Sequence, residues 1–194
     1  MKLILFFNGW GMDRGVVEKI ELPKDYDIEI INYPYIVKNN LEKYDDIILI
    51  GWSFGCYYLT KYLFSTGKKF DKIIGINGNG EILGKYGISP KIFEYTLNTL
   101  TSESLIKFYK NMEIDENFRY PQKSFENIKD ELENFKKIYE PLENIFTKII
   151  IGKNDKIVPS SRQKRYCVDK NINYEEIECG HYPFNYIKAW SEII

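Results

Sequence analysis

The feature that most limits what this chain can fold into is a regular alternation of short apolar runs with longer segments of helical spacing. Short apolar runs that end near Gly or Asn are typical of parallel strands in the centre of a sheet. Six strands are predicted: Leu3–Phe7, Asp27–Asn32, Ile47–Ile50, Ile73–Ile76, Ile149–Ile151 and Ile172–Ile177. Helices are predicted at Phe54–Thr66, Pro159–Cys167 and Tyr186–Ile194. This order predicts an α/β fold with a mainly parallel sheet and helices on both faces.

One long stretch interrupts the alternation. No strand pattern occurs between Gly80 and Thr147, where three helical patterns follow one another: Pro90–Leu100, Ser102–Met112 and Ser124–Tyr139. A helical insertion of this length between two strands is expected to form a cap over the edge of the sheet that carries an active site. Because 194 residues correspond to about one domain, we expect a single domain over residues 1–194 with the cap insertion at about 80–147.

Charge and hydropathy argue against several classes of partner. The chain has 27 Lys and Arg against 28 Asp and Glu, a net charge of −1, whereas nucleic-acid-binding proteins usually carry a basic excess. No apolar run approaches the roughly 18 residues that a membrane-spanning helix needs. A secretory cleavage site of the A-x-A kind is not expected either, since Ala189 is the only alanine. We therefore expect no nucleic-acid or membrane partner, and the sequence is compatible with a monomer.

The cysteines indicate a reducing compartment. Cys56, Cys167 and Cys179 are odd in number and lack the C-x-x-C spacing, so a disulfide framework is not expected. With one histidine and no paired cysteines, a zinc site of nitrogen and sulfur ligands is not expected either. The prediction is a cytoplasmic protein without a metal or cofactor.

The most informative motif is Gly51-Trp52-Ser53-Phe54-Gly55, which joins a predicted strand to a predicted helix. This is the context of a G-x-S-x-G nucleophile elbow, in which a serine on a sharp turn presents its hydroxyl above the sheet. Side chains two residues away on either side would clash at such a turn, which explains the two glycines. The alternative is a tight turn between strand and helix that carries no chemistry.

A serine nucleophile needs a base and an orienting carboxylate. His181, the only histidine, follows the last predicted strand, and Asp155 follows the strand before it. Both therefore belong to the carboxyl edge of a parallel sheet, where sites form in α/β proteins. The chain order Ser53, Asp155, His181 is that of α/β-hydrolases. Taken alone, Asp155 would serve equally well as a helix N-cap, because Pro159 follows closely.

An oxyanion hole needs two backbone N–H donors. One is expected at Phe54, the residue after the nucleophile, and the other at Trp10 in the Asn8-Gly9-Trp10-Gly11 loop after the first strand. The glycines would let this backbone approach a substrate closely. The loop lacks the G-x-G-x-x-G pattern and the lysine of phosphate-binding loops, and its alternative role is an ordinary Gly-rich turn.

Four segments together resemble the α/β-hydrolases: Asn8–Gly11, Gly51–Gly55, Asn154–Pro159 and Gly180–Phe184. The Phe-Phe-Asn-Gly-Trp-Gly opening and the compact length resemble more narrowly the BioG type of pimeloyl-[acyl-carrier protein] methyl ester esterase. The resemblance implies a nucleophile at Ser53, an acid at Asp155, a base at His181 and oxyanion donors at Trp10 and Phe54. It also implies a reaction, cleavage of the methyl ester of pimeloyl-carrier protein in biotin synthesis, with the acyl carrier protein as the partner that carries the substrate.

Other functions remain open from the sequence. The same residues would suit a general carboxylesterase, an acyl thioesterase or a silent hydrolase that serves only as a binding protein. The cap does not match the family residue by residue. Its aromatic residues could line an acyl slot or simply pack the cap on the sheet: Phe93, Tyr95, Phe108, Tyr109, Phe118 and Tyr120. Its basic residues, among them Arg119 and Lys123, could steer an acidic carrier protein or form a solvated mixed-charge surface.

Overall fold

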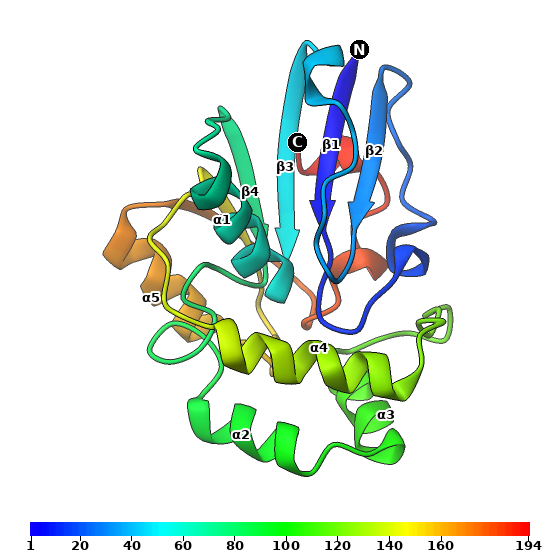
Figure 1. The fold of residues 1–194 in the computed structure, drawn as a ribbon, viewed down its shortest axis with the longest axis vertical. Helices are drawn as coiled ribbons and strands as arrows, with labels where there is room; N and C mark the ends of the chain where they lie inside the picture. Colours follow the sequence, from blue (N-terminus) through cyan, green and yellow to red (C-terminus); the bar gives the residue numbers. More distant parts are fainter.

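The computed structural model describes residues 1–194 and has six strands, five α-helices and four short 3₁₀ turns (Figure 1). The strands are β1 (Lys2–Phe7), β2 (Tyr26–Ile31), β3 (Asp46–Trp52), β4 (Lys72–Ile76), β5 (Lys148–Gly152) and β6 (Asn173–Ile177). The helices are α1 (Phe54–Thr66), α2 (Pro90–Asn98), α3 (Ser102–Asn111), α4 (Phe125–Ile138) and α5 (Ser160–Lys170). The 3₁₀ turns are η1 (Arg14–Val17), η2 (Leu41–Lys43), η3 (Pro183–Asn185) and η4 (Trp190–Glu192).

All six strands pair in parallel, in the order β2-β1-β3-β4-β5-β6. The sequence prediction of a parallel α/β sheet is therefore confirmed, and each predicted strand overlaps an observed one. The four central strands are buried except at their first one or two residues, which is why they appear as continuous apolar runs. Parallel pairing brings the carboxyl ends of all six strands to one edge of the sheet, as Figure 1 shows for β1–β4.

Two different kinds of cover close the faces of the sheet. Helix α1 packs on β1 and β3, and α5 packs on β5 and β6. Since the right-handed connections from β3 to β4 and from β5 to β6 cross the sheet in the same direction, both helices lie on one face. Phe7 faces α1 and contacts Tyr62. Its neighbour Phe6 points to the other face, where it contacts Phe184 and Trp190 of the C-terminal segment.

The C-terminal segment corrects one prediction. A helix was expected over Tyr186–Ile194, but only the turn η4 (Trp190–Glu192) is helical there, and Ala189 forms a β-bridge with Glu21. The Glu21 N–H donates to the Lys188 carbonyl, and the Trp190 N–H donates to the Glu21 carbonyl. These backbone groups bond to the connection between β1 and β2 and are not free to continue a helix. The apolar spacing of the segment instead places Trp190 on the sheet.

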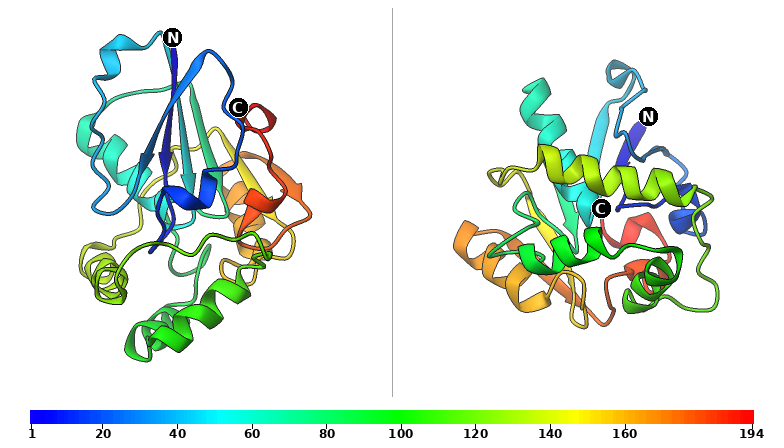
Figure 2. Two further views of the ribbon diagram at one scale, coloured as in Figure 1. Left: turned by 90° about the vertical axis from the view of Figure 1, so that its right-hand side faces the viewer. Right: turned by 60° about the horizontal axis from the view of Figure 1, so that its bottom comes forward.

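The three helices between β4 and β5 lie beyond the carboxyl edge of the sheet (Figures 1 and 2). Their bounds agree with the three predicted helical patterns to within two residues. Helix α4 contacts α1 directly, because the Phe135 ring stacks on Phe54 with centroids 4.1 Å apart and the Tyr57 hydroxyl donates to the Ile138 carbonyl at 3.0 Å. None of the helices in the structure has the length and apolar character needed to cross a membrane.

The cysteines give a direct test of the packing. Cys56, Cys167 and Cys179 are all buried, and burial raises the pKa of each thiol to about 12. We expect the native protein to show no reaction with a thiol reagent such as dithionitrobenzoate at pH 8, since both access and thiolate formation are suppressed.

In denaturant, the same assay should report all three thiols. Rapid reaction of a thiol in the native protein would contradict the buried placement of that cysteine.

Candidate active site

Ser53 occupies the turn between β3 and α1, with Trp52 as the last strand residue and Phe54 as the first helical residue. Its φ angle of 56° lies in the left-handed region, which is strained for a residue with a side chain. Backbone hydrogen bonds hold this conformation: the Ser53 N–H donates to the Ile76 carbonyl, and the Cys56 N–H donates to the Ser53 carbonyl, both at 2.9 Å. The turn therefore has the geometry that the G-x-S-x-G pattern predicts.

Glycines surround this turn because there is no room for side chains. A Cβ atom at Gly51 would lie 2.7 Å from the Cys56 Cα, and one at Gly55 would lie 1.9 Å from the Phe7 carbonyl oxygen. A third glycine, Gly78 after β4, was not singled out from the sequence, although a Cβ there would lie 2.5 Å from the Ser53 carbonyl oxygen. The close approach of three strand ends to the turn is what excludes Cβ atoms.

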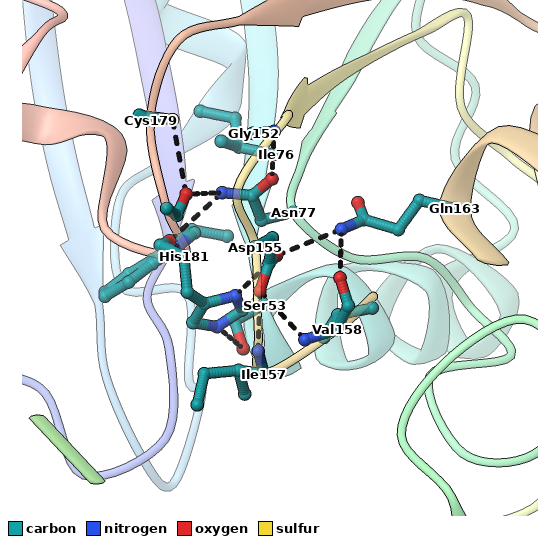
Figure 3. Close-up of polar contacts among 12 residues, drawn as sticks. Ser53, Ile76, Asn77, Gly152, Asp155, Ile157, Val158, Gln163, Cys179 and His181 are labelled. Carbon is teal, nitrogen blue, oxygen red and sulfur yellow. Dashed lines mark hydrogen bonds and ion pairs between the residues drawn. The ribbon is translucent and has the colours of Figure 1, made fainter. Parts of the chain in front are cut away.

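The three polar residues predicted from strand ends lie together in the structure (Figure 3). The Ser53 hydroxyl lies 2.8 Å from His181 Nε2, and His181 Nδ1 lies 2.8 Å from an oxygen of the Asp155 carboxylate. All three side chains are buried. A hydroxyl bonded to an imidazole that is itself bonded to a carboxylate is the constellation used for nucleophilic acyl transfer.

The Asp155 carboxylate is fully engaged. Its Oδ1 accepts from the N–H groups of Ile157 and Val158 at 2.8 and 2.9 Å, and its Oδ2 accepts from Gln163 Nε2 at 3.0 Å as well as facing His181 (Figure 3). The N-cap of α5 is Pro159, so Asp155 closes the turn before that helix and is not its cap. Gln163 lies one turn into α5 and had no recognisable signal in the sequence.

Asn77 is a second residue that sequence reasoning missed. It is buried at the end of β4 with a φ angle of 48°, and its amide nitrogen donates to the carbonyls of Gly180 and His181 at 3.1 and 3.0 Å. Its amide oxygen accepts from the Gly152 N–H at 2.7 Å. The Trp52 indole N–H adds a bond to the His181 carbonyl at 2.9 Å. From the sequence, Asn77 had only a strand-ending signal; in the structure it joins three strand ends beneath the histidine.

The two residues predicted to supply oxyanion donors both lie beside Ser53. Phe54 follows it directly, and Gly9 brings the loop so close that a Cβ there would lie 3.5 Å from the Ser53 Cβ. Neither Trp10 nor Phe54 donates its backbone N–H to a backbone or side-chain acceptor. In the loop, the N–H groups of Asn8, Gly9, Gly11 and Met12 all have acceptors, so the Trp10 N–H is the free one of residues 8–12.

A cavity of about 340 Å³ opens between the sheet edge and the cap, and Ser53, Trp10, Phe54 and His181 line it. The cap contributes most of its apolar wall, including Ile88, Ile92, Phe93, Tyr95, Phe108, Met112 and Leu132. The six aromatic residues of the cap singled out from the sequence fall into two groups. Phe93, Tyr95 and Phe108 line the cavity, whereas Tyr109, Phe118 and Tyr120 contact one another, with Phe118 also against Tyr182.

The family model described as pimeloyl-ACP methyl esterase BioG matches residues 1–193. The chain belongs to the BioG family. A solved BioG structure from Haemophilus influenzae is similar to this chain at a TM-score of 0.89 and 27% identity, covering 99% of this chain and 94% of the other. The description of this family is that of an esterase.

Two further similarities extend the comparison. A malonyl-[acyl-carrier protein] O-methyltransferase from Bacteroides fragilis is 33% identical over 84% of this BioG-family chain, which spans only 37% of that protein's length. An α/β-hydrolase fold protein from Burkholderia ambifaria aligns at a TM-score of 0.61 and 13% identity over 93% of this chain and 84% of its own. The second likeness shows the fold, and the predicted α/β-hydrolase class is confirmed.

Replacing Gly55 tests the tight turn. The methyl group of Gly55→Ala would collide with the backbone carbonyl of Phe7, and we expect a loss of unfolding free energy of about 3 kcal/mol. Gly67→Ala is the control, since that glycine has φ +64° but open space around its missing Cβ, and a loss of only about 1 kcal/mol is expected.

Urea unfolding curves of the two variants and the parent protein measure both values. Equal losses at the two positions would mean that the turn tolerates a Cβ at Gly55.

Proposed function

We propose that this BioG-family protein hydrolyses the methyl ester of pimeloyl-[acyl-carrier protein], with Ser53 as nucleophile, His181 as base and Asp155 as the orienting acid. The observation that carries the proposal is the hydrogen-bonded series from the Ser53 hydroxyl through His181 to Asp155 at the head of an apolar cavity. The family name supports the substrate. A second support is the similarity to a protein whose name describes O-methylation of a carrier-bound malonyl group, a reaction that would create such an ester.

The reaction follows from these contacts. Ser53 Oγ attacks the ester carbonyl while its proton passes to His181 Nε2, 2.8 Å away. The Asp155 carboxylate stabilises the imidazolium that forms. His181 then returns the proton to the methoxy oxygen, methanol leaves, and the pimeloyl group remains as an ester on Ser53. Water, activated by the same imidazole, hydrolyses this acyl-enzyme and releases the free carboxylate.

The free N–H groups of Trp10 and Phe54 supply the oxyanion hole in this scheme. Neither has another acceptor, so binding an oxyanion breaks no existing hydrogen bond. Phe54 is also the first residue of α1, and the positive end of the helix dipole favours negative charge there. Each donor of this kind contributes about 3–4 kcal/mol to transition-state stabilisation.

The cap provides the binding surface for the substrate. We assign residues 80–147 as a cap insertion within a single α/β-hydrolase domain, because cap and sheet residues form one continuous buried cluster. The cavity volume of about 340 Å³ is within the range of small-molecule pockets, and its apolar wall suits a chain of methylene groups. No cofactor or metal takes part in this scheme. We place the reaction in the cytoplasm, where three unpaired cysteines stay reduced.

In this proposal, basic residues beside the cavity bind the acyl carrier protein. Lys107, Lys156 and Arg162 line its wall. Lys156 pairs with Glu113 and Arg162 donates to the carbonyls of Gly84 and Gly87, so Lys107 is the side chain that can most readily meet the acidic surface or the phosphate arm of a carrier protein. Arg119 and Lys123, considered from the sequence, are less available, because Arg119 pairs with Glu18 and Lys123 pairs with the buried Glu131. Docking therefore depends more on the cavity mouth than on these two side chains.

The first test offers pimeloyl-[acyl-carrier protein] methyl ester to the wild type and measures methanol release. We expect turnover by the wild type and a loss on the order of 10⁴–10⁶-fold in Ser53→Ala, since the nucleophile is removed. Ser65→Ala, at an exposed serine of the same helix, is the matched control and should retain wild-type turnover.

Other substrates separate the alternatives in the same assay. Turnover of free methyl esters alone would replace the proposal by a general carboxylesterase, and turnover of carrier-bound thioesters alone would replace it by a thioesterase. Wild-type turnover in Ser53→Ala would remove the assigned nucleophile.

A second test isolates the Trp10 N–H. Trp10 and Gly11 occupy the two central positions of a turn closed by the Met12 N–H and the Gly9 carbonyl, with Gly11 at φ +70°. This is the type II pattern, in which proline is well tolerated at the first central position. Trp10→Pro therefore removes the N–H, whereas Trp10→Ala removes the same indole and keeps the N–H.

We expect Trp10→Pro to have kcat about 10²–10³-fold below that of Trp10→Ala. Equal kcat values in the two folded variants would exclude the Trp10 N–H as an oxyanion donor.

A further inference from the structure

Glu131 is a fully buried acidic residue that the proposed reaction does not use. It lies on cap helix α4, 0% exposed, and no motif in the sequence distinguishes it from the other acidic residues of that helix. Burial raises the pKa of its carboxyl group, while the nearby Lys123 ammonium and the hydroxyl of Tyr35 lower it. A carboxylate is costly to bury unless it is paired and hydrogen-bonded, so its partners are informative.

Two of the contacts that surround this carboxylate involve the Asn8–Met12 loop, which carries the Trp10 N–H. Glu131 Oε2 accepts from the Gly11 N–H at 3.1 Å and from Lys123 Nζ at 3.2 Å. Its Oε1 lies 3.0 Å from the Tyr35 hydroxyl, which also lies 3.1 Å from the Asn8 carbonyl oxygen. The carboxylate thus binds the loop at Gly11, and the single proton of the Tyr35 hydroxyl lies between the carboxylate and the Asn8 carbonyl.

Helix α4 also binds the side chain of Trp10. The Trp10 indole N–H donates to the Ile128 carbonyl at 2.8 Å, one turn before Glu131 on the same helix. A Cβ at Gly11 would lie 3.0 Å from Ile128 Cγ2, so the loop lies directly against the helix. Helix α4 therefore binds the indole of Trp10 and the peptide that follows it, through Ile128 and Glu131, while the Trp10 backbone N–H makes no hydrogen bond.

The turn type explains why these contacts matter. In a type II turn the central peptide, here Trp10–Gly11, is flipped relative to a type I turn. Glycine permits both orientations, since it populates positive and negative φ with similar ease. The Gly11 N–H belongs to this central peptide, whereas the Trp10 N–H belongs to the preceding Gly9–Trp10 peptide. A carboxylate that accepts from the Gly11 N–H selects one orientation of the central peptide, and so fixes the turn that follows the donor peptide.

We propose that Glu131 is a positioning residue for the oxyanion hole. By holding the Gly11 N–H it fixes the turn that follows the Gly9–Trp10 peptide, so that this peptide keeps its Trp10 N–H in the position that stabilises the transition state. The inference rests on the proposed function, because it needs the Trp10 N–H to bind the oxyanion. It adds a second task for the cap: α2 and α3 form most of the cavity wall, and α4 fixes part of the backbone beside Ser53. A preorganised donor loses its advantage when it must reorient during the reaction.

Three variants test the role. Glu131→Gln keeps an oxygen acceptor for Gly11 and can donate to the Tyr35 hydroxyl, so kcat should stay within about threefold of the wild type. Glu131→Asp keeps the charge but withdraws the carboxylate by one methylene, and kcat should fall about tenfold. Glu131→Ala removes the acceptor, and kcat should fall about 10- to 100-fold, bounded by the 10²–10³-fold cost of losing one oxyanion donor. KM should change less than twofold in all three.

Tyr57→Phe is the matched control. It removes the hydrogen bond from the Tyr57 hydroxyl on α1 to the Ile138 carbonyl at the C-terminal end of α4. This change leaves the contacts of the Asn8–Met12 loop in place. Its melting temperature should fall, as that of Glu131→Ala does, but its kcat should remain that of the wild type. This separates a general loss of cap stability from a loss of loop geometry.

The affinity of a boronic acid gives a second measurement. Its tetrahedral adduct with Ser53 places a hydroxyl in the oxyanion hole, so its Ki should rise in Glu131→Ala and Glu131→Asp in proportion to the loss of kcat/KM. The affinity of pimelate, which forms no such adduct, should stay unchanged. If Glu131→Ala does not fold, the comparison of Glu131→Asp with Glu131→Gln decides the question.

The outcomes distinguish the two proposals. Folded Glu131→Asp or Glu131→Ala with wild-type kcat, or a loss confined to KM, would overturn the positioning role while wild-type ester turnover leaves the proposed function in place. Lack of ester turnover by the wild type, with no labelling of Ser53 by a fluorophosphonate, would instead overturn the proposed function.

Discussion

The left-handed conformation of Ser53 is the constraint on which the site depends. A serine at φ 56° is unfavourable by itself, and it persists because the ends of three strands hold it. The Ile76 carbonyl accepts its N–H, while Gly55 and Gly78 allow the backbone of β1 and β4 to approach without a Cβ between them. The parallel sheet therefore supplies both the position of the hydroxyl and the space around it.

Buried polar side chains connect the loops that carry the other groups. Asn77 joins the ends of β4 and β5 to the His181 loop, and Gln163 joins α5 to Asp155. Glu131 joins the cap to the loop at Gly11. Asn77 and Glu131 bind groups that are distant in the chain, whereas Gln163 reaches back across the turn that precedes its helix. The polar groups that these side chains satisfy would be costly to leave without a partner. Polar networks of this kind fix loop geometry more narrowly than apolar packing does, because hydrogen bonds are directional.

The cap also holds backbone groups of the site in place through contacts with helix α4. Phe135 stacks on Phe54 and Trp10 bonds to Ile128, so α4 contacts both residues whose N–H groups are left free near Ser53. The helices of the cap also supply the apolar wall of the cavity. The wall comes mainly from α2 and α3, with Leu132 from α4, whereas the contacts to Trp10 and Phe54 come from α4. Different helices of the cap thus shape the cavity and hold the backbone beside Ser53.

The sequence by itself determined the parallel sheet and the helical insertion, because burial on two faces and helical spacing are periodic properties of the chain. It also determined that Ser53, Asp155 and His181 follow strand ends, because glycine at a tight turn and chain order are local properties. It missed the C-terminal segment, where a helix was expected over Tyr186–Ile194 but the backbone of residues 188–190 bonds to Glu21 instead. Asn77, Gln163 and Glu131 had no local pattern that marked them. Their roles were decided only by the tertiary structure. Asn77 and Glu131 bind residues that the fold, and not the chain, brings close, and Gln163 reaches Asp155 only because α5 starts at the right angle after the turn.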